Sequence, residues 1–127
     1  MNFGLAIPYT NGGHETWVVS LLSASSTPIA RRFEIWRPGA DDGTLTFHSG
    51  YCSSGADLDA IFSGKTVRKG EGTLGQTLAS TSPAIGPDVT GEASIAARAA
   101  AKAGLRQTVV LPVLDGGQLQ AVIAWYP

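Results

Sequence analysis

The pattern of apolar and polar positions contains one segment twice, near the two ends of the chain. Residues 7–13 (Ile-Pro-Tyr-Thr-Asn-Gly-Gly) match residues 111–117 (Leu-Pro-Val-Leu-Asp-Gly-Gly) position by position, and each copy is followed by a second apolar run. Two apolar runs joined by Asn-Gly or Asp-Gly predict a β-hairpin. The sequence between the copies is not itself repeated. The second copy therefore closes one complete module, and the first resembles the end of another.

Two further strands are predicted between these hairpins. From Ile29 to Arg37, Phe33 and Ile35 alternate with more polar positions, which indicates a strand that buries its Phe33 side. A loop follows at 38–43. The stretch from Thr44 to Tyr51 is predicted to return as a strand with Leu45, Phe47 and Tyr51 on one side.

The middle of the chain predicts helices. Residues 54–62 fit two helical turns capped by Ser54, 73–80 fit a short helix, and 92–103 form an alanine-rich helix that ends at Gly104. Residues 84–89 are predicted to be extended, and 107–114 with 119–126 form the closing hairpin. Because hairpin connections dominate, the expected fold is α+β, an antiparallel β-sheet with helices packed on it.

Composition limits the possible functions. The chain has 127 residues, 43% of them hydrophobic and 15% charged, which fits one globular domain. Its net charge of −1 gives no electrostatic footprint for nucleic acid or an anionic membrane. No apolar run is long enough for a membrane helix, and the N-terminus does not resemble a signal peptide. With Cys52 as its one cysteine, the chain is expected to be cytoplasmic.

Several motifs have simple structural interpretations. Residues 70–75 match G-x-G-x-x-G, but the preceding segment is not the apolar parallel strand of a dinucleotide site, so a tight turn into a helix is favoured. His14 is predicted in a turn and His48 on a strand, and nothing in the sequence brings them together. Because a metal site needs clustered ligands, none is expected. Asp57 and Asp59 are two apart on a helix and make a poor acid–base pair.

Four segments together resemble a GAF domain, a small regulatory module related to PAS domains. They are a strand pair with an acidic-glycine loop, a glycine-rich turn that leads into a helix, a proline segment followed by Asp-Val, and a final strand with its Asp-Gly-Gly hairpin. In this sequence they are residues 33–51, 69–76, 81–89 and 104–117. The resemblance covers about residues 29–127, and it implies a GAF-like antiparallel sheet with helices packed on it.

The beginning of the chain departs from the family. A GAF domain normally opens with a helix under the sheet, whereas residues 1–24 look like the final hairpin of a second GAF domain. We therefore divide the chain into an extra N-terminal hairpin and connector, 1–28, and a GAF-like domain, 29–127. Since a hairpin with free edges is marginal alone, it is expected to add to its own sheet or to that of a second chain.

The resemblance implies a non-catalytic sensory or regulatory module. It would bind a small molecule between the sheet and the segment of about 52–100, and signal through a partner or as a homodimer. No cofactor is identified, and neither nucleic acid nor membrane is an expected partner. The pocket-lining candidates are Tyr51, Cys52, Phe62, Leu74, Ile85, Arg98 and Thr108.

Two other functions remain open at this point. One is an assembly or dimerisation module whose pocket is filled by its own side chains. The other is an enzyme like the methionine sulfoxide reductases, using Cys52 as nucleophile, although the chain offers no second cysteine to resolve the intermediate. Arg98 also has an alternative role. Instead of binding an anionic ligand, its positive charge can offset the helix dipole at the end of its helix.

Overall fold

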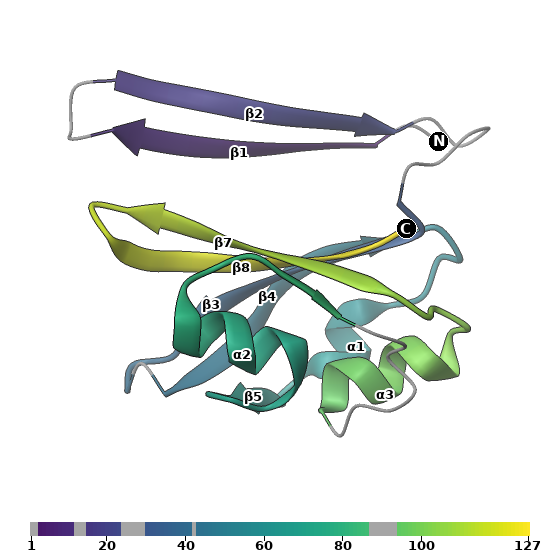
Figure 1. Cartoon of the computed structure of the whole chain (residues 1–127). Coiled ribbons are helices and arrows are strands. Elements are labelled where there is room, and N and C mark those ends of the chain that lie inside the picture. Colours follow the sequence, from purple (N-terminus) through teal and green to yellow (C-terminus); the bar gives the residue numbers. More distant parts are fainter. Residues whose placement is uncertain (1–2, 12–14, 24–29, 42, 87–93) are drawn as a thin grey trace.

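The structure is a computed structural model that describes residues 3–11, 15–23, 30–41, 43–86 and 94–127, with side chains from residue 30 onward. Strands and helices form a layered α+β arrangement (Figure 1). In chain order they are β1 (Phe3–Asn11), β2 (Glu15–Ser23), β3 (Arg32–Pro38), β4 (Thr44–Cys52), α1 (Leu58–Phe62), β5 (Thr66–Arg68), α2 (Gly72–Ser80), β6 (Ala84–Gly86), α3 (Ile95–Lys102), β7 (Thr108–Asp115) and β8 (Gln118–Tyr126).

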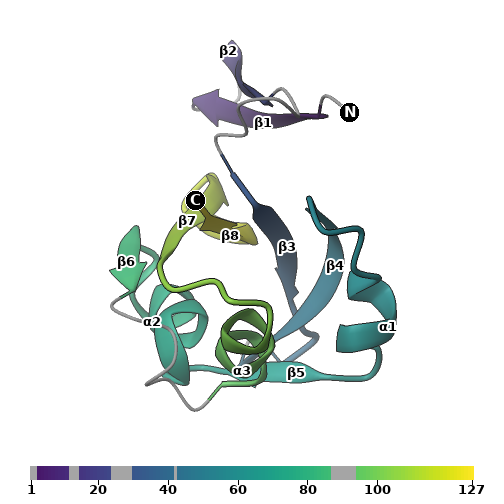
Figure 2. The ribbon, with the colours of Figure 1, turned by 90° about the vertical axis from the view of Figure 1, so that its right-hand side faces the viewer.

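The main sheet has six strands in the order β5-β4-β3-β8-β7-β6, and every neighbouring pair is antiparallel. The sheet curves around α2 and α3, while β1 and β2 lie on its opposite side (Figure 2). We call the face that carries the helices the inner face, and the other the outer face. The prediction of an antiparallel α+β fold is confirmed.

The duplicated segments form two hairpins whose registers agree away from the turns and differ by one residue from Leu114 onward. Ile7 pairs with Val19 in the first, and the equivalent residues Leu111 and Ile123 pair in the second. Gly116 and Gly117 take positive φ values of 58° and 81°, as the tight turn of the second hairpin requires. Both hairpin predictions are confirmed.

The position of the first hairpin differs from one expectation. Strands β1 and β2 form a separate two-stranded sheet, so they do not add to the chain's own sheet, and addition to the sheet of a second chain stays a prediction. Instead, β1 contacts β7 across the outer face, and the two strands run in the same direction (Figure 1). Ile123 on that face is only 3% exposed.

The helices largely follow their predicted ranges. Helix α2 begins at Gly72, and α3 is followed by Gly104 with a positive φ of 77°. Helix α1 is shorter than predicted, and its cap is Asp57 rather than Ser54: the Asp57 carboxylate accepts a hydrogen bond from Ala60 N at 3.2 Å. Ser94 caps α3, and residues 87–93 lie outside the described part of the chain.

The glycine-rich segment has a structural role at each glycine. Gly70 and Gly72 take positive φ values of 84° and 63° in the turn that leads to α2. A Cβ on Gly75 would lie 2.2 Å from the backbone oxygen of Arg68, so only glycine lets α2 pack this closely. Strand β5, just before the turn, is antiparallel to β4, which confirms that this is not a dinucleotide-binding unit.

Strand β3 reverses the predicted burial. Arg32, Glu34 and Trp36 face the helices and are 1%, 0% and 0% exposed, whereas Phe33 and Ile35 belong to the outer face. The prediction that the Phe33 side is the better buried one is therefore wrong. The inner core consists of aromatic contacts around Trp36 and of small alanines from α3.

A β-bulge at His48 changes the alternation of β4. Phe47 pairs with Trp36 and Ser49 pairs with Ile35, so His48 is an extra residue between them. Beyond the bulge the side chains exchange faces. Leu45 and Phe47 face inward, but Tyr51 stacks on Phe33 at the outer face. The prediction that all three share one side is wrong for Tyr51.

Candidate functional site

A row of polar side chains crosses the inner face of the sheet at one end. Arg32 on β3 pairs with Cys52 on β4 and with Tyr126 on β8, and all three side chains are buried. Glu34, two residues further along β3, faces the same way. The bulge at His48 is what brings Cys52 to this face. We call Arg32, Glu34, Cys52 and Tyr126 the inner polar cluster.

The Arg32–Glu34 ion pair is incompletely formed. Arg32 Nη1 and Glu34 Oε1 are 3.7 Å apart, which is longer than the roughly 2.8 Å of a charge-assisted hydrogen bond. Glu34 Oε2 accepts hydrogen bonds from Trp36 Nε1 at 3.0 Å and from Tyr126 OH at 3.5 Å. Among the described residues, Glu34 Oε1 and Arg32 Nε and Nη1 have no hydrogen-bond partner. Such atoms are unusual in a buried site.

Burial also changes the protonation of Glu34. Removal from water raises the pKa of its carboxyl from 4.5 to about 7, although Trp36, Arg32 and Tyr126 act in the opposite direction. Near neutral pH this carboxyl exchanges between its charged and neutral forms. It can then either accept or donate a hydrogen bond in the inner polar cluster.

Cys52 occupies the end of the row beside Arg32. Its Sγ lies 3.1 Å from the Ser54 hydroxyl. Burial raises the pKa of the thiol, but hydrogen bonds with Ser54 and Arg32 and the charge of Arg32 outweigh this and lower the pKa below its ordinary value.

Two further buried polar side chains are threonines. Thr77 on α2 and Thr108 on β7 are 0% and 3% exposed, and neither hydroxyl oxygen has a partner among the residues described. Thr108 and Tyr126 border a closed cavity of about 10 Å³, which has room for about one water molecule. The other residues lining it are Thr73, Leu74, Ser94, Ala96 and Ala97.

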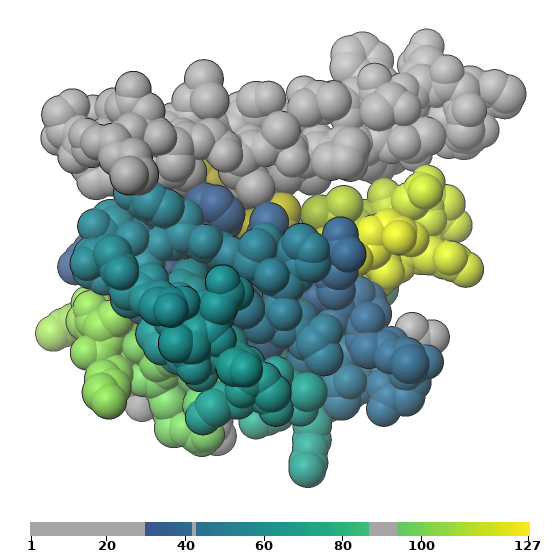
Figure 3. Space-filling view, turned by 180° about the vertical axis from the view of Figure 1, so that it is seen from behind, coloured from purple at the N-terminus to yellow at the C-terminus, as the bar shows by residue number. Residues whose placement is uncertain are grey.

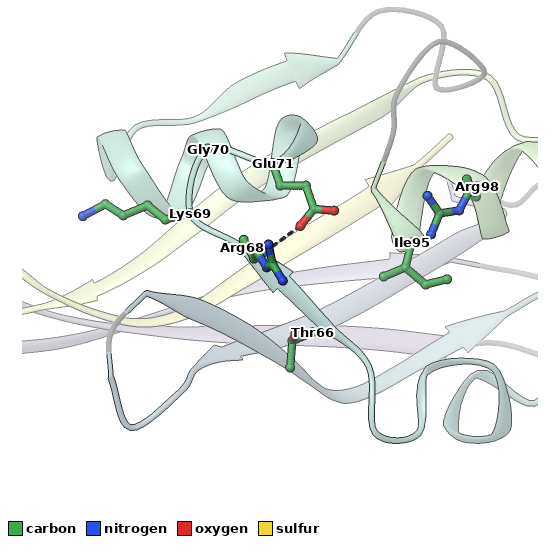
Figure 4. Close-up of a pocket in the computed structure, with 7 residues that line it drawn as sticks. All are labelled: Thr66, Arg68, Lys69, Gly70, Glu71, Ile95 and Arg98. Carbon is green, nitrogen blue, oxygen red and sulfur yellow. Dashed lines mark hydrogen bonds between the residues drawn. The ribbon is translucent and has the colours of Figure 1, made fainter.

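A larger groove lies outside this layer, between α3 and the turn before α2. It has a volume of about 530 Å³ and opens to solvent. Glu71 Oε2 accepts a hydrogen bond from Arg68 N at 2.9 Å, and Arg98 faces this turn from α3 (Figure 4). The lining residues are Thr66, Arg68, Lys69, Gly70, Glu71, Ile95 and Arg98.

The structure brings some of the predicted pocket residues together and separates others. Leu74 and Thr108 line the closed cavity, and Cys52 belongs to the inner polar cluster. Phe62 packs edge-on against Trp36, with ring centres 5.1 Å apart, in the adjoining aromatic core.

The other three candidates lie elsewhere. Tyr51 is on the outer face, Ile85 is 77% exposed on β6, and Arg98 lines the open groove. Sequence analysis missed Arg32 and Glu34. One signal could have identified them: in the alternation of β3, Arg32 and Glu34 lie on the same side as Trp36, a large aromatic residue that is usually buried.

Some other kinds of site find no support in the described part of the chain. No group of three or more His, Cys, Asp and Glu side chains comes together there as metal ligands would. None of the helices described has the length and apolar character needed to cross a membrane.

Comparison with solved structures identifies the fold. The A. aeolicus nlh2 GAF domain in an inactive state aligns with a TM-score of 0.56 and 22% identity, over 77% of this chain and 57% of its own length. The free methionine-R-sulfoxide reductase of Neisseria meningitidis, in complex with its substrate, aligns with a TM-score of 0.56 and 14% identity, over 76% of this chain and 52% of its own.

A third structure, an NreA protein from Staphylococcus aureus mutated in its nitrate binding site, gives a TM-score of 0.58 and 13% identity over 77% of this chain and 72% of its own. No protein-family model and no curated protein sequence matches the chain. The chain spans little more than half of the first two structures. At these identities the likeness establishes the fold: the chain has a GAF-like fold, which confirms the resemblance seen in its sequence.

Proposed function

We propose that this chain is a non-catalytic sensory or regulatory module that binds a small polar molecule between the inner face of its sheet and helices α2 and α3. The incomplete Arg32–Glu34 pair is the observation that carries this proposal. A buried guanidinium and carboxylate with unused hydrogen-bonding atoms are costly for a purely structural core, because each unpaired buried group destabilises the fold.

The unused atoms define the chemistry of the ligand. Arg32 offers N–H donors to an oxyanion or carbonyl oxygen, while Glu34 and the two threonine hydroxyls can accept hydrogen bonds. The GAF-like neighbours support a small-molecule role, since one is described by its nitrate binding site and another was solved with its substrate. The closed cavity is too small for either, so binding requires α2 or α3 to move away from the sheet.

Two rival functions each have an observation in their favour. The small size of the closed cavity, about 10 Å³, favours an assembly module whose interior is filled by its own side chains. The lowered pKa of the Cys52 thiol favours a sulfoxide reductase. The reductase would need an external thiol to complete its cycle, because the chain has one cysteine.

The test is to identify what the purified chain binds. Native mass spectrometry followed by denaturing extraction reports a retained compound and the oligomeric state, and thermal shift is then measured with nitrate, acetate and free methionine sulfoxide as probes. The control is the double variant Arg32→Met/Glu34→Gln, which removes both charges together so that neither is left buried alone.

We expect a retained compound, or stabilisation by one of the probes, in the wild type and its loss in the folded double variant. An empty chain that none of the probes stabilises, and whose double variant melts at a higher temperature, would instead support the assembly module. Turnover of methionine sulfoxide with a small thiol, abolished by Cys52→Ser, would support the reductase.

A further inference from the structure

Cys52 is a buried residue that adjoins an exposed turn. It is the last residue of β4 and is 8% exposed, and the next three residues, Ser53 to Gly55, are exposed in a turn. The segment containing β4 and α1 faces solvent in the view of Figure 3. The thiol is therefore buried next to an exposed turn, and its neighbour Arg32 is buried more deeply.

The side of Cys52 that faces the protein carries a positive charge with unused donors. Arg32 pairs directly with Cys52 across β3 and β4, and its Nε and Nη1 have no hydrogen-bond partner in the described residues. Its counter-ion Glu34 is held 3.7 Å from Nη1, and Glu34 Oε2 accepts hydrogen bonds from Trp36 and Tyr126 instead. A thiolate beside such a guanidinium is stabilised, and so is any anion that forms on the sulfur.

We infer that Cys52 is a site of reversible oxidation by hydroperoxides, with Arg32 as the cation that activates its sulfur and holds the oxidised product. This inference does not require a ligand in the inner polar cluster, and it goes beyond the binding function proposed above.

The chemistry is a two-electron transfer. The Cys52 thiolate attacks one oxygen of hydrogen peroxide, an S–O bond forms, and the O–O bond breaks. The sulfur is oxidised to a sulfenic acid, the peroxide is reduced, and the departing hydroxide takes the proton of the original thiol to leave as water. A sulfenic acid normally condenses with a nearby thiol, but this chain has one cysteine, so reduction requires an external small thiol.

The charges around the sulfur favour this reaction at neutral pH. Arg32 and the Ser54 hydroxyl lower the pKa of the thiol, and the charge of a Cys52 thiolate in turn raises the pKa of the Glu34 carboxyl on β3. Because the pKa of Glu34 is raised to about 7, its carboxyl is partly neutral near neutrality and does not fully offset the charge of Arg32. The sulfenate oxygen would accept a hydrogen bond from the unused Arg32 donors, which draws Arg32 away from Glu34.

The first experiment measures oxidation of the intact chain. Wild-type protein and the variants Arg32→Met, Arg32→Lys and Arg31→Met are treated with equimolar hydrogen peroxide at pH 7, and a sulfenic acid is trapped with dimedone and quantified by intact-mass spectrometry. Arg31→Met removes the same charge from the exposed neighbouring position and serves as the matched control.

We expect trapping in the wild type and in Arg31→Met, a rate about tenfold lower in Arg32→Met, and partial rescue by Arg32→Lys, since the rate follows the thiolate fraction. A reducing thiol should restore the original mass. Equal rates in folded Arg31→Met and Arg32→Met would overturn the role of Arg32, and the absence of any trapped product in the wild type would overturn the inference itself.

A second measurement remains decisive if Arg32→Met does not fold. The rate of iodoacetamide alkylation of the wild type is followed from pH 5 to 10, in buffer and in denaturant. The inference requires the folded midpoint to lie below the unfolded one, which is about 8.5 for a free cysteine. Ser54→Ala should move the folded midpoint upward and Ser53→Ala should not. A folded midpoint at or above the unfolded one contradicts the inference.

Discussion

At the scale of single residues, the buried carboxyl of Glu34 links the protein's stability to pH. Its pKa is 4.5 when exposed and about 7 in the folded chain. Between these two values the unfolded chain has lost this proton and the folded chain still holds it. The folded state therefore binds more protons, and its stability must fall as the pH rises through this range.

We predict that Glu34→Gln removes this pH dependence. The Glu34 contribution to the free energy of unfolding is complete below about pH 4.5 and declines by about 3 kcal/mol by about pH 7, from a pKa difference of some two and a half units. Urea denaturation at half-unit pH steps measures the difference between variant and wild type. Asp115→Asn is the control, because this exposed turn residue has asparagine in the first copy of the hairpin. A wild-type curve parallel to that of Glu34→Gln would contradict the prediction.

The same residue shows a limit of sequence analysis. Alternation along β3 was detected correctly, but hydrophobicity assigned the wrong face to the core. Both faces of this central strand are covered, by helices on one side and by β1 and β2 on the other, so burial does not separate them. The polar face is the more deeply buried one, and pairing of Arg32 with residues on β4 and β8 cannot be derived from β3 alone.

At the scale of elements, one inserted residue decides which side chains reach the inner face. The apolar pattern of β4 is regular through His48, and nothing in its sequence marks the bulge. The partner strand reveals it, since Ile35 and Trp36 are adjacent whereas Ser49 and Phe47 are not. Hairpins and helices were predictable from local signals such as Asp-Gly-Gly and Gly104, but a change of register is a property of two strands together.

We predict that deleting His48 is strongly destabilising although the side chain is exposed. Without the extra residue, Tyr51 would turn inward against the buried cluster and Cys52 would turn outward. We expect the free energy of unfolding to fall by about 2 kcal/mol or more, measured by urea denaturation. His48→Ala keeps the bulge and should change stability by less than about 0.5 kcal/mol. A deletion variant as stable as His48→Ala would show that the bulge is dispensable.

Helix α2 offers a second test at this scale. Glycine to alanine within a helix normally stabilises a protein by about 1 kcal/mol. At Gly75 the new Cβ would lie 2.2 Å from the Arg68 backbone oxygen, so we predict that Gly75→Ala lowers the free energy of unfolding by about 2 kcal/mol. Thermal or urea denaturation measures it, with Gln76→Ala on the exposed side of α2 as the control. Stabilisation by Gly75→Ala would refute the close packing.

At the scale of the whole molecule, the first hairpin forms a layer on the outer side of the main sheet. The outer face carries an apolar cluster that would otherwise face water: Phe33, Ile35, Tyr51, Val113 and Ile123. The hairpin covers this cluster without joining the sheet, so its contribution is burial of side chains rather than strand pairing.

We predict that a chain consisting of residues 30–127 folds with lower stability and self-associates. Uncovering Phe33 and Ile123 should lower the free energy of unfolding by about 2 kcal/mol or more. It should also expose an apolar surface that promotes self-association. Light scattering at increasing concentration measures association. Adding Phe33→Thr and Ile123→Thr to the shortened chain should restore the monomer, while a shortened chain that is monomeric and fully stable would show that the hairpin is not needed.

The position of the first hairpin on the outer face has a topological consequence. The contact between β1 and β7 joins two different surfaces, and the surface that β1 occupies exists on every molecule. A hairpin released from its own chain fits a neighbour equally well. Reciprocal exchange of hairpins between two molecules gives a closed, domain-swapped dimer. If each molecule instead places its hairpin on the next one, an open-ended polymer forms. We therefore expect the length of chain between Ser23 and Arg32 to influence which of these arrangements is favoured.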